Sequence, residues 1–85
     1  GLTEFVSRKD KNEMWMLDET SVLKLDMGKG ELSEIATGYS VSHINILPKH
    51  DWLVMSEVGD ATKSAPRLHF FDPTTLKDVK AVDMP

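Results

Sequence analysis

Residues 68–85 read LHFFDPTTLKDVKAVDMP, and this stretch decides the fold. A run at 68–71 that is apolar except for His69 leads into Asp72-Pro73-Thr74-Thr75, and a second run with charges spread along it follows. Asp at the first position and Pro at the second are favoured in a tight turn. The stretch therefore predicts two β-strands, at 67–72 and 76–84, joined as a hairpin.

The rest of the chain shows the same punctuation. Turn residues recur about every eight to twelve positions, which is typical of all-β proteins. No window of about twelve residues keeps the apolar stripe of an amphipathic helix. The sequence predicts eight strands, at 3–7, 13–17, 21–26, 31–37, 42–47, 52–58, 67–72 and 76–84.

The two halves of the chain can be aligned. Residues 13–17 match 51–55, residues 22–26 match 68–72, and residues 31–35 match 75–79, with shifts of 38, 46 and 44 residues. Asp26 and Asp72 recur at the same place, where an Asp side chain caps the following turn. A period of about 40 residues with four strands per unit is typical of a propeller blade. We therefore expect an all-β fold of two four-stranded antiparallel blades, at 1–41 and 42–85, within one structural unit. The alternative is a small β-sandwich or barrel.

The stretch 68–85 resembles the repeat of YVTN-type propellers, a group that includes the heavy chains of quinoprotein amine dehydrogenases. Residues 22–35 resemble a weaker copy, with Gly28-Lys29-Gly30 in the turn. Met84-Pro85 stands where the family's repeat usually closes with Gly. The resemblance implies a blade. It does not by itself imply a dehydrogenase, because the quinone of those enzymes sits on a smaller chain and nothing here matches a cofactor-bearing segment. We expect no cofactor.

Two blades do not close a propeller, since a ring of about four to eight blades is the stable arrangement. The runs 14–17 and 52–55 are apolar on both faces of their strands, as in sheets covered on both sides. We therefore expect self-association, with three copies giving six blades or four giving eight, or packing against the rest of a longer propeller chain.

Composition narrows the partners. The 85 residues are 40% hydrophobic and 28% charged, with a formal net charge of −4. This balance argues against nucleic acid and against an anionic membrane surface. The longest apolar runs have four residues, whereas a membrane helix needs about 20. A soluble protein is expected, in the cytoplasm or in the periplasm or outside the cell, and the absence of Cys excludes disulfides.

Histidines supply the first candidate contacts. His43 and Asn45 point to the same side of the expected strand 42–47. They would line a central channel and meet a polar ligand or a metal, or His43 would bond a neighbouring blade. His50 and Asp51 form a possible acid–base pair in a turn, or a solvated turn. His69 lies mid-strand and is expected to be structural; the three histidines lack metal-site spacing, and we expect neither a metal nor a catalytic residue.

Trp15 and Trp52 are candidate platforms for a sugar or an aromatic partner, or core residues at corresponding places in the two blades. An acidic patch on one rim would bind a basic partner or a cation, or is solvated loop charge; it comprises Asp18, Glu19, Glu57 and Asp60.

The predicted function is a non-catalytic binding or scaffold module, whose blades present loops to a protein or small-molecule partner. One alternative is part of a propeller enzyme, lactonase-like or of the amine-dehydrogenase type, in which missing blades complete the site. The other is a ring-forming lectin with Trp15 and Trp52 as sugar platforms. The fold alone does not choose among them.

Overall fold

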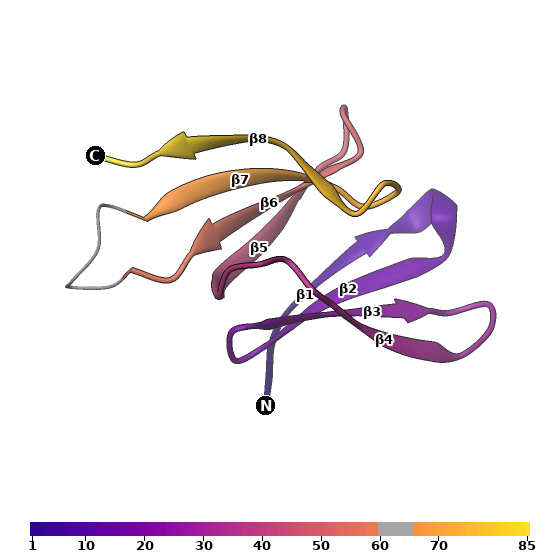
Figure 1. Ribbon diagram of the computed structural model, residues 1–85. Helices are drawn as coiled ribbons and strands as arrows, with labels where there is room; N and C mark the ends of the chain where they lie inside the picture. Colours follow the sequence, from indigo (N-terminus) through magenta and orange to yellow (C-terminus); the bar gives the residue numbers. More distant parts are fainter. Residues whose placement is uncertain (60–65) are drawn as a thin grey trace.

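The computed structural model describes residues 1–59 and 66–85. The chain forms two four-stranded antiparallel sheets, each with its strands in sequence order (Figure 1). The first sheet holds β1 (Leu2–Arg8), β2 (Glu13–Asp18), β3 (Ser21–Asp26) and β4 (Glu31–Ile35). The second holds β5 (Val41–Leu47), β6 (Trp52–Glu57), β7 (Arg67–Asp72) and β8 (Lys77–Asp83). Within the described residues the one helical element is a 3₁₀ turn, η1 (Lys9–Lys11).

The all-β prediction is confirmed, and all eight strands lie within two residues of the predicted bounds. The two sheets stay separate and do not close on each other, so the barrel alternative is wrong. Val41, placed at the end of the first repeat by the sequence, is the first residue of β5. Most of the polar loop expected at 59–66 lies outside the described residues.

Two hairpin turns share one construction, as the recurring Asp predicts. The Gly30 N–H donates to the Asp26 carbonyl at 2.7 Å, and the Leu76 N–H donates to the Asp72 carbonyl at 2.8 Å. Asp26 Oδ1 accepts the Lys29 N–H at 3.0 Å, and Asp72 Oδ1 accepts the Thr74 and Thr75 N–H groups. Each Asp therefore caps its own turn, which confirms the predicted role of both residues.

Strand pairing shows how the two sheets correspond. The pair Leu2–Asp18 in the first sheet is followed by a bulge, and so is the pair Val41–Glu57 in the second. Leu2 in the first sheet and Val41 in the second are 39 residues apart, and so are Asp18 and Glu57. Corresponding residues of β3 and β7 are 46 residues apart. The offset in the sequence alignment equals the structural one for β3 and β7 and is one residue too small for β2 and β6. For β4 and β8 the structural offset is 46 before the bulge in β8 and 47 beyond it, so the sequence offset of 44 is two or three residues too small.

The one-residue correction changes the equivalents of the tryptophans. Trp15 corresponds to Val54, and Trp52 corresponds to Glu13. The prediction that the tryptophans occupy corresponding places is therefore wrong. Because successive side chains of a strand point to opposite faces, a slip of one residue exchanges the two faces of a sheet.

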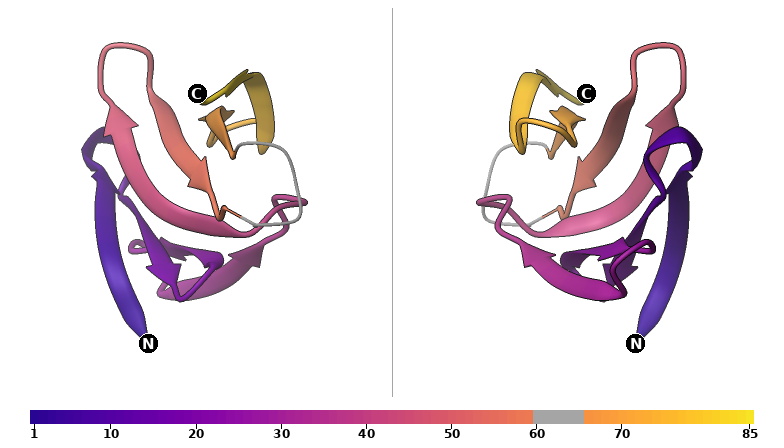
Figure 2. Two further views of the ribbon diagram at one scale, coloured as in Figure 1. Left: turned by 90° about the vertical axis from the view of Figure 1, so that its left-hand side faces the viewer. Right: turned by 90° about the vertical axis from the view of Figure 1, so that its right-hand side faces the viewer.

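The core lies between the sheets. Trp15, Leu17 and Val22 on the inner face of the first sheet meet the inner face of the second, formed by Val41, Ile44, Leu53, Met55 and Phe71. The Trp15 and Phe71 rings pack edge to face with centroids 5.9 Å apart. β5 contacts both β1 and β2, and it crosses beside the first sheet in both views of Figure 2. Each fully buried apolar side chain contributes about 1.5–3 kcal/mol of transfer free energy.

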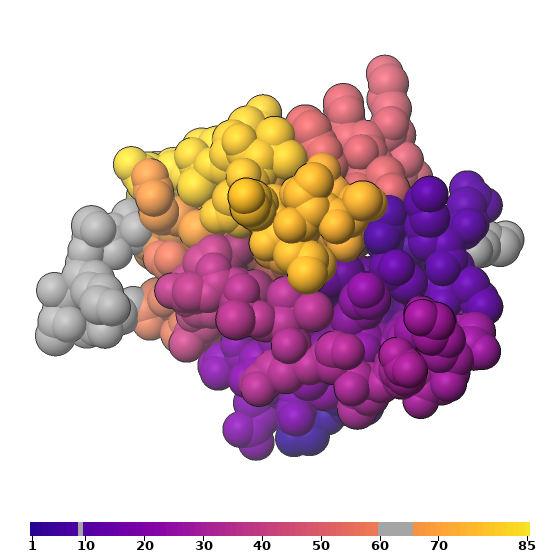
Figure 3. Space-filling model, turned by 45° about the vertical axis from the view of Figure 1, so that its right-hand side comes forward, coloured from indigo at the N-terminus to yellow at the C-terminus, as the bar shows by residue number. Residues whose placement is uncertain are grey.

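Residues 36–40 carry the chain from β4, at the edge of the first sheet, to β5. The Val41 N–H donates to the Thr20 carbonyl at 3.0 Å, and the Val58 N–H donates to the Ser40 carbonyl at 2.9 Å. The β7–β8 turn lies at the junction of the two sheets, as the space-filling view shows (Figure 3). Among the described residues, no helix has both the length and the apolar composition to cross a membrane.

Candidate functional site

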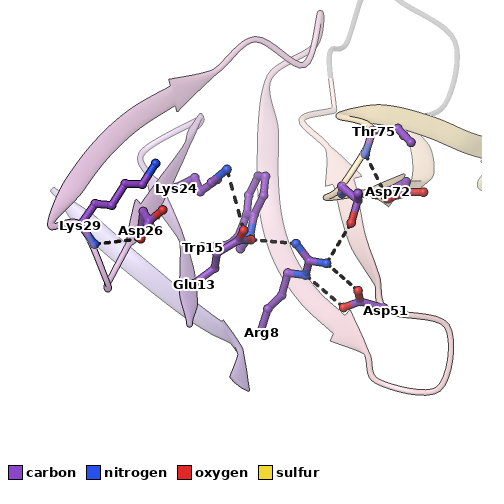
Figure 4. A network of polar contacts seen from close by, with 10 residues as sticks. Arg8, Glu13, Trp15, Lys24, Asp26, Lys29, Asp51, Asp72 and Thr75 are labelled. Carbon is purple, nitrogen blue, oxygen red and sulfur yellow. Dashed lines mark hydrogen bonds and ion pairs between the residues drawn. The ribbon is translucent and has the colours of Figure 1, made fainter. Parts of the chain in front are cut away.

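A network of polar contacts joins the ends of the two sheets through Arg8 (Figure 4). Arg8 is 3% exposed, and its Nε and Nη2 atoms donate to Asp51 Oδ1 at 3.0 Å and Oδ2 at 2.6 Å. Nη1 donates to Glu13 Oε1 at 2.8 Å, and Nη2 also donates to Thr74 Oγ1 at 3.0 Å. The guanidinium thus binds one carboxylate with two parallel bonds and ties three turns of the chain together.

The charges of this contact reinforce each other. Hydrogen bonding to Asp51 raises the pKa of Arg8 despite the burial of the guanidinium, with Glu13 adding to the effect. The hydrogen bonds from Arg8 hold the pKa of Asp51 below its ordinary value. Asp51 is therefore the partner of a distant cation rather than of its neighbour His50. His50 instead stacks on Trp52, with ring centroids 4.6 Å apart, so this pair is not arranged as the predicted acid–base pair.

His43 lies on β5, an edge strand of the second sheet, and reaches the first sheet. Its Nδ1 is 2.6 Å from Glu4 Oε2, and Glu4 Oε1 accepts the Ile44 N–H at 2.8 Å. Partial burial on its own raises the pKa of Glu4, but the bonds from Ile44 and His43 outweigh it and hold this pKa below the ordinary value. The Asn45 side chain accepts the Ile46 N–H at 2.8 Å. His43 thus bonds a neighbouring sheet, and Asn45 bonds its own strand.

The two tryptophans have different surroundings. Trp15 is 0% exposed, and its indole N–H donates to Glu13 Oε1 at 3.1 Å. It offers no face to a ligand, so the proposal of Trp15 as a sugar platform is corrected. Trp52 is half-buried, stacks on His50 and packs edge to face on Phe70 at 6.3 Å. Trp52 belongs to the surface of the second sheet that faces away from the core.

Sequence reasoning missed a buried cluster around His69. His69 is 4% exposed, with Nδ1 2.7 Å from Asp78 Oδ2 and Nε2 3.2 Å from Glu57 Oε1. The Tyr39 ring stacks on the imidazole at 3.6 Å, and the Tyr39 hydroxyl lies 2.9 Å from Asp78 Oδ1. Burial, and then the Asp78 carboxylate, raise the pKa of Tyr39. The available signal in the sequence was that His69 lies two residues before Phe71 and therefore on the same face of β7. Its partners come from β6, β8 and the segment 36–40.

The remaining predicted groups do not converge. Asp18 and Glu19 lie 3.4 and 3.5 Å from the amino terminus, while Glu57 faces His69, and Asp60 lies outside the described residues. In residues 1–59 and 66–85, no three His, Asp or Glu side chains are grouped as a metal site. Asp78 and Glu57 contact opposite nitrogens of the His69 ring, so the three side chains do not point at one position where a metal ion would be bound.

Depressions lie on the surface of the described residues, two of them near groups discussed above. One, of about 340 Å³, lies between the first sheet and residues 36–40 and includes Thr20, Val22 and Tyr39 in its lining. The other, of about 300 Å³, lies beside Arg8 and includes Lys11, Ile46 and Asp51. In the second depression, the Arg8 guanidinium is already bonded to the carboxylates of Asp51 and Glu13 and to the Thr74 hydroxyl, so Arg8 does not present a free charge to a ligand.

Both sheets carry an apolar face directed away from the core, as the strand pairs show. We call the first outer face M; it comprises Phe5, Met14, Met16, Leu23, Leu25 and Leu32. We call the other outer face W; it comprises Leu47, Trp52, Val54, Leu68, Phe70 and Val82. Phe5 and Leu32 are 55% and 59% exposed, and Val82 is 44% exposed. Met16 of face M is only 5% exposed, so the two faces are apolar but open to solvent in part.

Comparison with protein-family models, with curated proteins and with solved structures found no match for this chain.

Proposed function

We propose that this chain is a non-catalytic scaffold module made of two β-propeller blades, with hairpin turns that contact a partner. The observation that carries the proposal is the correspondence of the two sheets. They share strand order, bulge position and Asp-capped turns at offsets of 39 and 46 residues. Four-stranded meanders that repeat in this way are the units of a propeller.

The faces of the sheets support the same function. The inner face of each sheet is buried against the other, and each outer face carries six apolar side chains. A sheet that is apolar on both sides is suited to an architecture in which it is covered on both sides. A two-layer sandwich would leave faces M and W in water, and a radial stack of blades covers them.

The hairpin turns form the surface available to a partner. Four of them lie at the ends of the sheets joined by Arg8, at 9–12, 27–30, 48–51 and 73–76. Lys11, Lys29 and Lys49 are exposed on these turns, against one exposed acid, Asp10. The opposite ends of the strands carry exposed acids, Glu19, Glu34 and Asp83. The hairpin rim is therefore the more basic of the two, and an acidic protein surface is the partner that it suits.

The test compares two charge-reversed variants as baits in extracts of the source cells. One variant carries Lys11→Glu, Lys29→Glu and Lys49→Glu on the hairpin rim. The matched control carries Glu19→Lys and Glu34→Lys on the opposite rim. Both are expected to melt within a few degrees of the unmodified chain, since single exposed charges contribute little to stability. Loss of a captured protein by the hairpin-rim variant only is the expected result, and equal capture by both variants overturns the proposal.

A further inference from the structure

We propose that face W of one chain docks on face M of a second copy, head to tail. The inference rests on the correspondence of the two sheets used under the proposed function, and it names the occupant of the outer faces. Within one chain, the contact already joins the inner face of the first sheet to the inner face of the second.

The offset of 39 residues between the sheets shows that each outer face corresponds to a face that is buried in the other sheet. The inner positions Trp15 and Leu17 become Val54 and Ser56 when shifted by 39, and these lie on the side of face W. The outer positions Met14 and Met16 become Leu53 and Met55, which lie in the core. Face W is thus the counterpart of the first sheet's buried face. Face M is the counterpart of the second sheet's buried face.

The equivalence continues the internal contact into a second copy. Within the chain, the inner face of the first sheet packs on the inner face of the second sheet. Face W is equivalent to the inner face of the first sheet, so it can pack on a face that is equivalent to the inner face of the second sheet. Face M of another copy is such a face. The core contact of Trp15 with Phe71 then has a counterpart between copies, and it joins Val54 to Leu25 of the next chain.

Charges at the new contact are compatible with docking. Arg8 corresponds to Leu47, and Glu13 corresponds to Trp52, so face W has apolar residues where the inner face carries its buried ion pair. The partners of Arg8, Asp51 and Thr74, correspond to Asn12 and Gly28 on the next copy. Docking therefore buries neither an unpaired cation nor an unpaired carboxylate at these positions, which would oppose association.

At the edge strands β1 and β5, an acidic side chain would also meet a histidine across the contact between copies. Glu4 meets His43 and the Ile44 N–H within one chain, and the equivalent of Glu4 is His43. Between copies, His43 is thus placed against Glu4 and Phe5 of the next chain. The Nδ1 of His43 already contacts Glu4 of its own chain, but the side chain is 77% exposed, so the rest of the ring is accessible to this second contact.

Two different faces meet in this contact, so it is heterologous, and each added copy presents a new free face W and face M. Such contacts close into a ring when the rotation between copies allows it. Since propellers contain about four to eight blades and each chain supplies two, closure is expected with two to four copies.

Cysteine cross-linking tests the predicted neighbours directly, because the chain contains no native Cys. Val54→Cys and Leu25→Cys variants are purified separately, mixed, and treated with a bis-maleimide that spans about 10 Å, the usual separation of packed sheets. The expected product is a covalent heterodimer from the mixture, with none from either variant alone. Lys49→Cys in an exposed turn replaces Val54→Cys in the control and is expected to give none.

Light scattering on a sizing column then tests the polarity of the contact. The unmodified chain is expected at two to four times its 9.5 kDa mass. Val54→Lys blocks face W, and Leu25→Glu blocks face M, so each variant alone is expected at the single-chain mass. Mixed together, they are expected to form a 1:1 dimer, because each retains the face that the other lacks. A symmetric contact between like faces predicts no such rescue.

An unmodified chain that stays at 9.5 kDa at high concentration and gives no cross-linked product overturns the docking of a second copy. A dimer that cross-links Val54→Cys to itself overturns the head-to-tail arrangement. Neither result bears on capture by the hairpin rim, so failure of this inference is distinguishable from failure of the proposed function.

Discussion

Arg8 of the first sheet and Asp51 of the second form a two-bonded ion pair, with Nε–Oδ1 and Nη2–Oδ2 distances of 3.0 and 2.6 Å. The pair joins residues 43 positions apart at the ends of two sheets. It also marks a difference between the sheets, because Leu47 stands at the position of the second sheet that corresponds to Arg8. One ion pair thus stabilises the contact inside the chain and has no counterpart on face W.

Replacing Arg8 by Met tests the contribution of this contact. The change removes the cation bonded to Asp51, whereas Glu13 keeps Lys24 at 3.9 Å. We expect the free energy of unfolding to fall by about 2–4 kcal/mol, measured by urea denaturation. Arg67 is the matched control, since it pairs with Asp83 and both side chains are exposed. Arg67→Met is expected to change stability by no more than about 0.5–1 kcal/mol. Equal effects of the two variants would contradict the role of Arg8.

The same contact predicts a dependence on acid. Because Arg8 holds the pKa of Asp51 below its ordinary value of 3.8, the folded state binds this proton less readily than the unfolded chain. The stabilisation is complete above that ordinary value and is lost as the pH falls through the lower pKa of the folded state. Asp51→Asn is expected to make the pH dependence of the unfolding free energy shallower. An unchanged slope in the variant would show that Asp51 is not paired in solution.

The tryptophans are expected to differ in a way that fluorescence resolves. Trp52→Phe leaves Trp15, which is fully buried, and its emission is expected to resist quenching by acrylamide until the protein unfolds. Trp15→Phe leaves Trp52, whose half-buried ring is expected to be quenched in the folded monomer, where face W is not covered by a second copy. Trp15→Ala should cost about 3–5 kcal/mol, as a large core truncation does. Equal quenching of the two single-tryptophan variants in the monomeric state would place Trp15 at the surface.

Two equivalent turn positions allow a reciprocal exchange. Gly30 and Leu76 both have a left-handed backbone, with φ of 69° and 62°, and each closes its turn onto an Asp carbonyl. A side chain costs about 1–2 kcal/mol in this conformation, more than the chain entropy that Gly adds, so Leu76→Gly is expected to stabilise by roughly 0.5–1 kcal/mol. Gly30→Leu should destabilise. Thermal melting of the two variants, measured side by side, checks the opposite signs.

Tyr39 is the one tyrosine of the chain, so its ionisation is measurable without overlap. Burial and the Asp78 carboxylate raise its pKa above the ordinary value of 10.0. The stabilisation from the protonated hydroxyl is complete below pH 10.0 and is lost as the pH rises further. We expect tyrosinate absorbance at 295 nm to appear only together with unfolding. A separate titration near pH 10 in the folded protein would show that Tyr39 is exposed.

Local chemistry is sufficient to predict the strands and turns of this chain. The Asp72-Pro73 turn, the alternation in 21–26 and the spacing of turn residues act within a few residues, and their predicted elements are found in the structure. The recurrence of Asp26 and Asp72 predicted the turn caps for the same reason, because each carboxylate bonds the backbone two or three residues ahead.

Pairing register required more than the sequence shows. An alignment offset of 38 matched Trp15 to an apolar neighbour as well as the observed offset of 39 does. The offset of 38 matches the apolar runs 14–17 and 52–55 residue for residue, whereas the observed offset of 39 matches Leu17 to Ser56, so residue type favoured the wrong offset. The offset of 38 matched Trp15 to Leu53, another inner residue, whereas the observed offset of 39 matches it to Val54 on the outer face. Only the paired strands, with their bulges, show that Trp52 points away from the core.

The sequence by itself determined the all-β class, the strand order within each hairpin and the turn caps, because these depend on backbone preferences and bonds between near neighbours. Tertiary structure brought Asp51 to Arg8, His43 to Glu4 and Tyr39 to His69, and each of these partners comes from a segment distant in the chain. It also decided which apolar face is buried. Long polar side chains take whichever partner sheet packing brings within reach, and this depends on how apolar surfaces fit together rather than on sequence spacing.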